Sequence, residues 1–326
     1  MPREASLSKI EAAAAFGATV ESYGDSVEQA VQRARELSEG EGLTFVHPFD
    51  DPDVIAGQGT MGLELVEQVP DLARVIVPLG GGGLASGVAV AVKSLRPEVA
   101  VVGVQAEACA PFPGSLAQGA PVAATGSLTI ADGIAVKRPG VLTLRLVGRW
   151  LDGVEVVSEE EIVDAVGLLL ERSKLVVEGA GAVGVAALLA GRVAPAPTGT
   201  TVAILSGGNI DIGLLAGLAR YRESRLGRRL VLLTRVGDRP GSLARLLAVV
   251  GDAGANLLEV SHLRDGVALG VRQTAIQLVL ETRGQTHAEE VVARAQGAGY
   301  PVERLRLSDL MSIEAPPAGA AEALGP

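Results

Sequence analysis

The 326-residue chain is long enough for one large domain or for two or three smaller domains with buried cores. Hydrophobic residues make up 48% of it and aromatic residues only 2%, which predicts a core of Ala, Val and Leu. A net charge of −10 argues against nucleic acid or an anionic membrane as the main partner. The single cysteine, Cys109, excludes an internal disulfide and a cysteine metal cluster, and it fits a reducing cytoplasm.

The first seventy residues read as helices separated by short apolar runs. Residues 6–14, 26–39 and 53–69 have helical spacing, and residues 18–21 and 43–47 are expected to be strands. The start of the chain has no apolar core of the signal-peptide kind. The uncharged window 75–92 holds five glycines, a proline and a serine, so a strand, a turn and a buried helix are favoured there over a membrane span.

Four consecutive glycines, at residues 80–83, stand between an apolar run (75–79) and a predicted helix (84–94). Backbone can approach an anion closely where side chains are missing, and a helix N-terminus offers free N–H groups. The pattern therefore predicts a phosphate cradle. Gly80, Gly82 and Ala85 also satisfy the dinucleotide fingerprint G-x-G-x-x-G/A, with Glu107 near the expected ribose position. A turn without a ligand is the third interpretation.

The next part of the chain alternates strands with helices. Strands are expected at 99–105, 154–157 and 201–205, and helices at 159–173, capped by Ser158, and at 180–189; residues 110–114 read as a loop. This alternation predicts an α/β fold whose parallel sheet is covered by helices.

Residues 220–229 are rich in charged side chains, unlike the apolar segments before them, and this predicts a linker. Beyond it the expected order is strand 230–236, helix 242–253, strands 256–263 and 273–281, helix 286–299 and strand 302–307. This βαββαβ order is typical of a ferredoxin-like domain. The tail from residue 312 is rich in Ala, Pro and Gly and is expected to be disordered.

Several segments together resemble threonine ammonia-lyase (threonine dehydratase), of the tryptophan-synthase-like, fold type II pyridoxal phosphate (PLP) enzymes. The main ones are Pro78-Leu-Gly-Gly-Gly-Gly-Leu-Ala-Ser-Gly87 and Ser206-Gly-Gly-Asn-Ile-Asp211. Residues 44–51, 55–60, 103–107, 130–137 and 177–182 also agree with the family, and the likeness runs from about residue 6 to residue 307.

The resemblance implies PLP as cofactor and assigns it a binding site. Its phosphate would be held by backbone N–H groups, and Ser206 would meet its pyridine nitrogen. The implied reaction converts threonine to 2-oxobutanoate and ammonia, and serine to pyruvate, in isoleucine biosynthesis or threonine catabolism. The phosphate-binding residues implied in this chain are Gly80, Gly81, Gly82, Gly83 and Leu84.

The family holds PLP as a Schiff base on a lysine in a Ser-x-Lys-x-Arg-Gly setting near the N-terminus. The four lysines of this chain, Lys9, Lys93, Lys137 and Lys174, do not have that setting, and Lys137 lies closest to the expected site. The asparagine loop that covers the cofactor ring in the family has no counterpart either. We therefore expect a family member without its front part, with no catalytic residue to assign and inactive when alone.

Other polar residues are weaker candidates. His47 is expected to be structural, and His262 and His287 to lie on the surface. Glu107 would be a cation ligand in some relatives, but its second acidic partner is replaced by Pro113, so no metal site is assigned. Glu178 is expected either to cap a helix or to line the active site.

The C-terminal domain resembles an ACT domain, a small amino-acid-sensing module. A branched-chain amino acid such as isoleucine or valine would bind as an effector, in a chain expected to form a homo-oligomer; oligomerisation alone is the alternative role. The regulatory residues implied are Asp238, Arg239, Pro240, Gly241 and Asn256. The expected domains are a remnant of the small PLP subdomain (1–40), the large PLP-binding domain (41–219), a linker (220–228), the ACT domain (229–308) and a tail (309–326).

Two other functions stay open at this point. One is a non-catalytic amino-acid-binding or scaffold protein that kept the fold. The other is an NAD-type dinucleotide-binding oxidoreductase, which rests on the glycine fingerprint alone. The segment 206–209 argues against the oxidoreductase, because dinucleotide folds have no use for it.

Overall fold

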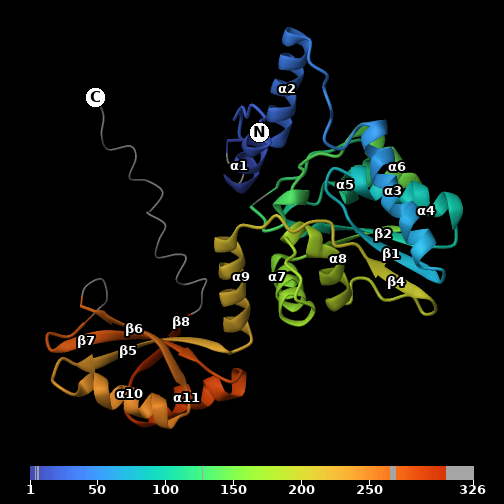
Figure 1. Cartoon of the computed structure of the whole chain (residues 1–326). Coiled ribbons are helices and arrows are strands. Elements are labelled where there is room, and N and C mark those ends of the chain that lie inside the picture. The colour runs from blue at the N-terminus through green and yellow to red at the C-terminus, as the bar shows by residue number, and fades with distance from the viewer. Residues whose placement is uncertain (4, 6, 127, 265–268, 306–326) are drawn as a thin grey trace, which may run out of the picture. The chain divides into compact units, whose positions relative to one another are not determined.

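A computed structural model describes residues 1–3, 5, 7–126, 128–264 and 269–305. The chain forms two compact units, Met1–Leu214 and Leu215–Pro326, which are considered separately below (Figure 1). No helix in the described part of the chain is both long and apolar enough to span a bilayer.

The first unit is built on a parallel sheet, which confirms the predicted α/β class. Its strands are β1 (Leu72–Pro78), β2 (Ala100–Ala106), β3 (Gly153–Val157) and β4 (Thr200–Ala203). They pair in the order β3-β2-β1-β4, with Ile76 opposite both Val102 and Ala203. Parallel strands expose their carboxyl ends along one edge of the sheet, so the loops after β1 and β4 leave side by side.

Helices cover both faces of this sheet (Figure 1). Val75 and Val77 of β1 pack into a core with α4 (Gly83–Leu95) and α6 (Val141–Trp150), while Ile76 faces Gly184 of α8 (Gly179–Leu189). The alternation of a strand places these neighbours on opposite faces. The remaining helices around this sheet are α3 (Pro52–Gln68), α5 (Pro111–Gln118) and α7 (Glu159–Leu168). A π-helical stretch, Leu169–Ser173, continues α7, and single 3₁₀ turns occur at Glu107–Cys109 and Asp132–Ile134.

The N-terminal region is helical, with α1 (Leu7–Ala15) and α2 (Val27–Glu41). The strands predicted at 18–21 and 43–47 were wrong, because neither segment has a strand beside it among the described residues. The backbone near the first one instead meets the chain start, where Tyr23 N donates to the Met1 carbonyl at 2.8 Å. Apolar alternation without a partner strand does not make a ladder.

The loop predicted at 110–114 is also wrong, since α5 begins at Pro111. Two prolines suggested a break, but the first turn of a helix needs no intrahelical N–H donors, so Pro111 and Pro113 fit there. The predicted cap of α7 is confirmed: Ser158 and Glu161 form a reciprocal capping box.

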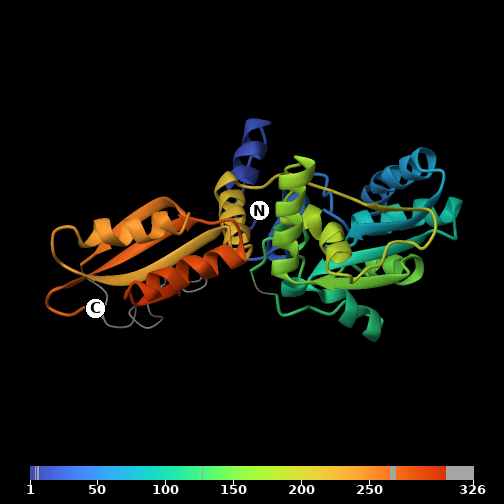
Figure 2. The ribbon, with the colours of Figure 1, turned by 90° about the horizontal axis from the view of Figure 1, so that it is seen from below.

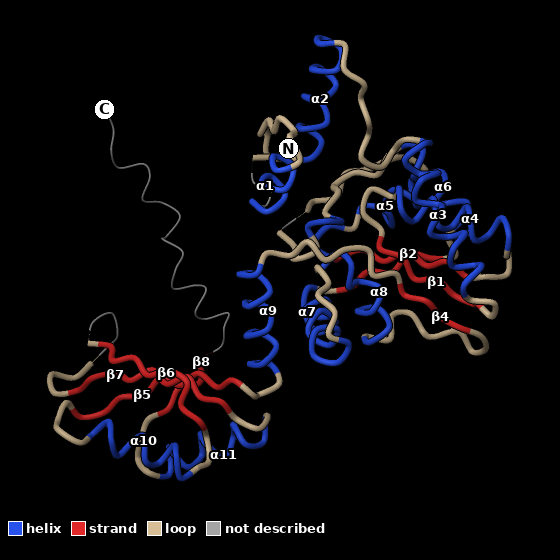
Figure 3. Tube along the Cα trace, viewed as in Figure 1, coloured by secondary structure: helices blue, strands red, loops and turns tan. Residues whose placement is uncertain are grey.

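The second unit contains an antiparallel sheet, one face of which is covered by the helices Ser242–Asp252 and Gln285–Gly297 (Figure 3). Its elements are α9 (Ile212–Arg225), β5 (Arg229–Gly237), α10 (Ser242–Asp252), β6 (Asn256–Leu263), β7 (Gln273–Glu281), α11 (Gln285–Gly297) and β8 (Val302–Leu305). The strand order β6-β7-β5-β8 is ferredoxin-like, as predicted. Figure 2, seen from below, shows α10 and α11 side by side over the sheet, where they close the core around Leu232 and Ile276.

Two predictions concern the two ends of this unit. The segment from residue 220, expected to be a linker, is helical up to Arg225, where α9 ends. The tail expected to be disordered lies outside the described residues.

Candidate functional site

The glycine segment is the loop between β1 and α4. It leaves the carboxyl end of β1, and α4 begins at Gly83 with Gly82 as its N-cap. Gly82 has a φ of 99°, a conformation that favours glycine. The first N–H groups of α4 have no intrahelical acceptor, so they remain available to an anion at this helix end.

Neighbouring groups enclose every glycine of this loop. A Cβ added at Gly81 would overlap the Phe49 ring, and one at Gly80 would lie 2.9 Å from Ile134 Cα. At Gly82 it would lie 2.8 Å from both Phe112 Cζ and Thr143 Cβ. The loop is therefore held in one shape by packing, which explains why glycine occupies all four positions.

Phe49 is held against the loop by the residues on either side of it. The Asp50 carboxylate accepts hydrogen bonds from the N–H groups of Val141, Leu142 and Thr143, at 2.9–3.0 Å, and so caps α6. His47 Nδ1 accepts from the backbone N–H groups of Phe49, at 3.2 Å, and Asp50, at 2.8 Å. His47 therefore has the structural role expected of it.

Two hydroxyl groups near the glycine loop are left without a hydrogen bond in the described part of the chain. Thr143 Oγ1 and Ser86 Oγ are both buried and unpaired there. Thr143 Oγ1 would lie 3.2 Å from a Cβ added at Gly82, and Ser86 is in the first turn of α4. Buried hydroxyls without partners are costly. Together with the free N–H groups, they fit a cradle for an oxyanion such as the phosphate of PLP.

A second loop, residues 206–211, follows β4 at the same edge of the sheet. Ser206 is exposed, and Gly207 lies against the N-terminus of α8, where its carbonyl accepts from Glu178 N at 3.1 Å. A Cβ at Gly207 would overlap the Glu178 carboxylate. The structure thus joins the two glycine-containing loops through the strand pair β1 and β4.

Glu178 is the N-cap of α8 and also faces the second loop. Burial, and after it the charge of Asp132, raises the pKa of the Glu178 carboxyl, while Lys9 acts in the opposite direction. Lys9 Nζ lies 2.6 Å from Asp132 Oδ2. Sequence reasoning missed this charged cluster, because its members are 46 and 123 residues apart along the chain; the segment 130–137 was the only hint.

The structure gives each lysine a different setting. Lys93 pairs with Asp152 at 2.8 Å, and Lys174 donates to the Glu171 carbonyl at 2.7 Å. Lys137 is exposed, and its carbon chain lies near Gly126. Lys9 is the lysine that reaches the charged cluster beside Glu178.

The weaker candidates lie in both units. Glu107 is exposed in the turn Glu107–Cys109. No group of three or more His, Cys, Asp or Glu residues suited to a metal ion occurs in the described ranges, and the absence of a metal site stays a prediction. Cys109 is buried. The surface position predicted for His287 was wrong: its Nε2 lies 2.9 Å from the Ala253 carbonyl oxygen, and its Nδ1 accepts from Arg283 N. The helical spacing of apolar residues does not reveal that a histidine side chain binds backbone groups of neighbouring turns.

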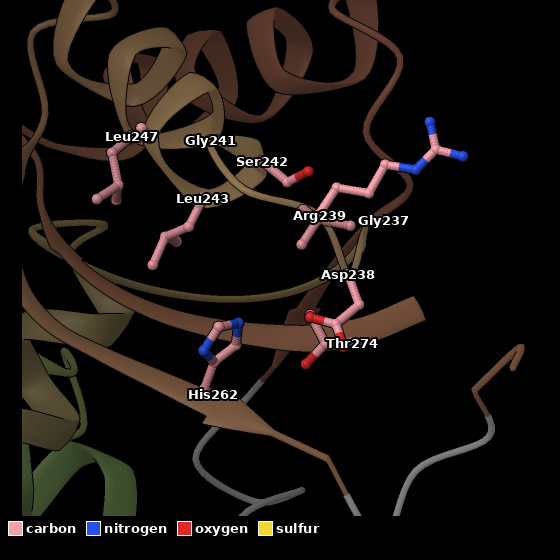
Figure 4. A pocket seen from close by; sticks show the side chains of 11 residues that line it. Gly237, Asp238, Arg239, Gly241, Ser242, Leu243, Leu247, His262 and Thr274 are labelled. Atoms are coloured by element: carbon pink, nitrogen blue, oxygen red, sulfur yellow. The ribbon is translucent and has the colours of Figure 1, made fainter. Parts of the chain in front are cut away.

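The second unit contains a cavity of about 360 Å³ between the 237–242 loop, α10 and the sheet (Figure 4). Leu243 and Leu247 form an apolar side, and Asp238, His262 and Thr274 lie at the other side. The predicted residues Asp238, Arg239 and Gly241 line it, although the Arg239 side chain points away from the cavity (Figure 4). Asn256 opens β6 as predicted and donates to Glu281 Oε2 at 3.0 Å, away from this cavity lining.

The parallel sheet and its glycine loop define an α/β protein that binds a phosphate-bearing cofactor at the carboxyl edge of the sheet. The chain belongs to the pyridoxal-phosphate-dependent enzyme family, whose model matches residues 1–207. This membership rules out the NAD-type interpretation of the glycine fingerprint and identifies PLP as the cofactor.

Curated relatives extend the likeness. The chain is 46% identical to L-threonine ammonia-lyase of Thermotoga maritima over 303 residues, which is 93% of this chain and 75% of that protein. It is 42% identical to the catabolic L-threonine dehydratase TdcB of Escherichia coli, over 69% of this chain and 68% of the relative. The first match is longer than the 214 residues of the first unit, so it includes part of the second.

Solved structures share the fold. Maize serine racemase superposes with a TM-score of 0.62 at 35% identity, covering 69% of each chain. The processed form of threonine deaminase isoform 2 from Solanum lycopersicum superposes with a TM-score of 0.61 at 35% identity, covering 67% of this chain and 64% of the other. Both comparisons support the fold type II architecture.

Proposed function

We propose that the chain provides the cofactor-binding machinery of a PLP-dependent L-threonine ammonia-lyase, which forms 2-oxobutanoate and ammonia from threonine and pyruvate from serine. The observation that supports this most is the glycine loop at the start of α4, where an added Cβ at any of the four glycines would crowd a neighbour while the first N–H groups of the helix stay free. The relatives with the same activity in their names support the choice of threonine.

The residues of this chain have defined tasks in that proposal. The N–H groups from Gly80 to Leu84 would bind the cofactor phosphate, and the unpaired Thr143 hydroxyl beside Gly82 is available to the same cradle. The Ser206 hydroxyl forms a hydrogen bond with the pyridine nitrogen. When bound, PLP acts as an electron sink for the substrate α-carbon.

Glu178 is suited to hold a proton beside the ring. Its raised pKa means that it keeps a carboxyl proton more readily than a free glutamate. A neutral carboxyl next to the 206–211 loop donates a hydrogen bond where a carboxylate would only accept one. We place Glu178 in the wall of the active site as well as at the cap of α8.

The proton transfer at the substrate α-carbon needs an amine as the base. None of the chain's four lysines has the sequence setting of the family's lysine, so the assay supplies an amine from outside. The deciding assay loads the full chain with PLP and follows 2-oxobutanoate formed from L-threonine, with and without methylamine as an external amine. We expect formation above that of free PLP when methylamine is present, with D-threonine as the inactive control. Bound PLP without any 2-oxobutanoate would favour the non-catalytic, amino-acid-binding alternative.

Borohydride reduction and peptide mapping then show whether a lysine of this chain takes part. A pyridoxyl label on Lys9 or Lys137 would assign that residue the amine's role. Absence of a label, with product dependent on methylamine, would support our expectation that the chain alone is inactive.

For the second unit we propose an ACT-type regulatory role. A branched-chain amino acid fits a cavity with Leu243 and Leu247 on one side and the polar groups of Asp238 and Thr274 on the other. Calorimetric titration of the full chain with L-isoleucine and L-valine tests it, and Leu247→Asn should abolish the heat. No heat with either amino acid would leave oligomerisation as the role of this unit.

We also propose that the chain works as a homo-oligomer in the cytoplasm. The edge strand β6 exposes Leu257, Leu258 and Val260, which a second copy would cover. Sedimentation at equilibrium tests this, and Leu258→Lys should shift the protein toward the monomer.

A further inference from the structure

A pocket of about 240 Å³ lies between α2, the His47–Phe49 turn and residues 136–140. It is separate from the cavity of the second unit. Its lining has two kinds of side chain: apolar groups that include Val31, Phe49 and Val136, and polar groups that include Arg35, His47 and Arg138. The proposed reaction assigns it no role.

The two arginines of this pocket, Arg35 and Arg138, have no acidic partner among the side chains that the structure describes. In the part of the chain that the structure describes, no carboxylate lies within ion-pairing distance of Arg35 or Arg138. The carboxylates nearest to His47 are committed elsewhere: Asp50 caps α6, and Asp51 accepts from the first N–H groups of α3. Arg35 Cζ lies 5.1 Å from the centre of the Phe45 ring, a contact that leaves its charge in place. Two guanidinium groups without a described carboxylate beside them form a site of positive potential.

His47 adds a donor of defined orientation. Because Nδ1 accepts two backbone N–H groups, the ring proton of the neutral side chain is on Nε2. Burial lowers the pKa of His47, and Arg35 acts in the same direction, so the neutral form is favoured. The pocket thus combines two charged donors, one neutral donor and an apolar floor.

We propose that this pocket binds a small aliphatic carboxylate, with the carboxylate between Arg35 and Arg138 and the hydrocarbon part on Val31 and Phe49. Guanidinium groups recognise carboxylates in a planar, charge-assisted way, and the apolar floor favours a short carbon chain over a fully hydrated anion such as inorganic phosphate. The proposal does not depend on the lyase activity.

The pocket shares Phe49 with the glycine loop. One part of this residue lines the pocket, while its ring also stands where a Cβ of Gly81 would be. A ligand that orders Phe49 therefore acts on the loop, and by linkage PLP and the carboxylate change each other's affinity by the same factor.

The test is calorimetric titration of the full chain with butanoate, with butanamide as the neutral analogue of the same shape. We expect saturable binding of butanoate. Butanamide should bind at least about tenfold more weakly, since one charge-assisted contact is worth roughly a factor of ten in affinity. The double variant Arg35→Gln and Arg138→Gln should lose butanoate binding. The double variant Arg145→Gln and Arg149→Gln, on the exposed side of α6, has the same net charge and should keep it.

Three results would overturn the proposal: equal affinity for butanoate and butanamide, binding that survives in the Arg35/Arg138 double variant, or inorganic phosphate that displaces butanoate at equal concentration. Phosphate binding that persists in the double variant belongs to the glycine loop, which separates failure of this pocket from failure of the cofactor site.

Discussion

The two units use the same local design in opposite ways. In each, a strand leads through a glycine-containing loop into a helix whose N-cap glycine has a positive φ, 99° at Gly82 and 81° at Gly241. A Cβ added at any of the four glycines of the first loop would crowd a neighbour, whereas at Gly237 it would meet nothing within 4 Å and at Gly241 only the end of the Arg245 side chain, at 3.2 Å. Packing around such a loop, more than its glycine content, separates a fixed cradle from an open pocket.

The largest effect should come from filling the cradle. Gly81→Ala drives a methyl group into Phe49, and overpacking of this kind costs roughly 1–3 kcal/mol. Gly237→Ala meets open space and should change stability by no more than about 0.5 kcal/mol. Urea unfolding of both variants measures the difference. Equal stabilities would contradict the account of the packed loop.

The next effect concerns the residue that holds Phe49 in place. Asp50→Ala removes the cap of α6 and should cost about 1–2 kcal/mol, and it should also weaken PLP binding because Phe49 loses its support. Asp51→Ala removes the cap of α3 and should lower stability without changing PLP affinity. An unchanged PLP affinity in Asp50→Ala would show that Phe49 does not need this support.

A smaller effect is the pH dependence due to Glu178. Since its pKa is raised in the folded state, the native protein binds more protons above pH 4.5, and stability from this group falls as pH rises through the folded pKa. Glu178→Gln should flatten that fall. Glu64→Gln, at an exposed position of α3, should leave it unchanged in urea unfolding between pH 4.5 and 7.

The smallest effect is that of His47, which has the opposite sign. Its pKa is lowered by burial, so the unfolded chain binds more protons and stability rises with pH up to about 6.5, the ordinary histidine pKa. His47→Gln should reduce this rise, and His262→Gln, on the exposed strand β6, should not. Urea unfolding at pH 5, 6 and 7 measures the rise. The same rise in wild type and in His47→Gln would show that His47 does not contribute to it.

The sequence predicted the elements that carry their own signals. Local patterns were enough to predict strongly apolar strands such as β1 and the cap at Ser158. They were also enough for the order of strands and helices in the second unit. The predicted strands at 18–21 and 43–47 failed because a strand depends on a neighbour that no local pattern reveals.

The site was predictable only in its backbone part. The glycine loop is contiguous, so its residues could be named from the pattern. The supports of that loop, Phe49, Asp50 and Thr143, come from distant positions, and so do Lys9 and Asp132 beside Glu178. Tertiary contacts between such positions become visible only when the chain is folded.

The most direct test of the central claim, that residues 80–84 hold the PLP phosphate, is an equilibrium titration of the full chain with PLP, competed by inorganic phosphate. Wild type and Gly57→Ala, whose added methyl group meets nothing, should bind PLP with the same affinity and release it to phosphate. Gly81→Ala should bind at least about tenfold more weakly, as expected for a loss of roughly 1.4 kcal/mol. PLP binding that phosphate does not displace, and that Gly81→Ala does not weaken, would contradict the account.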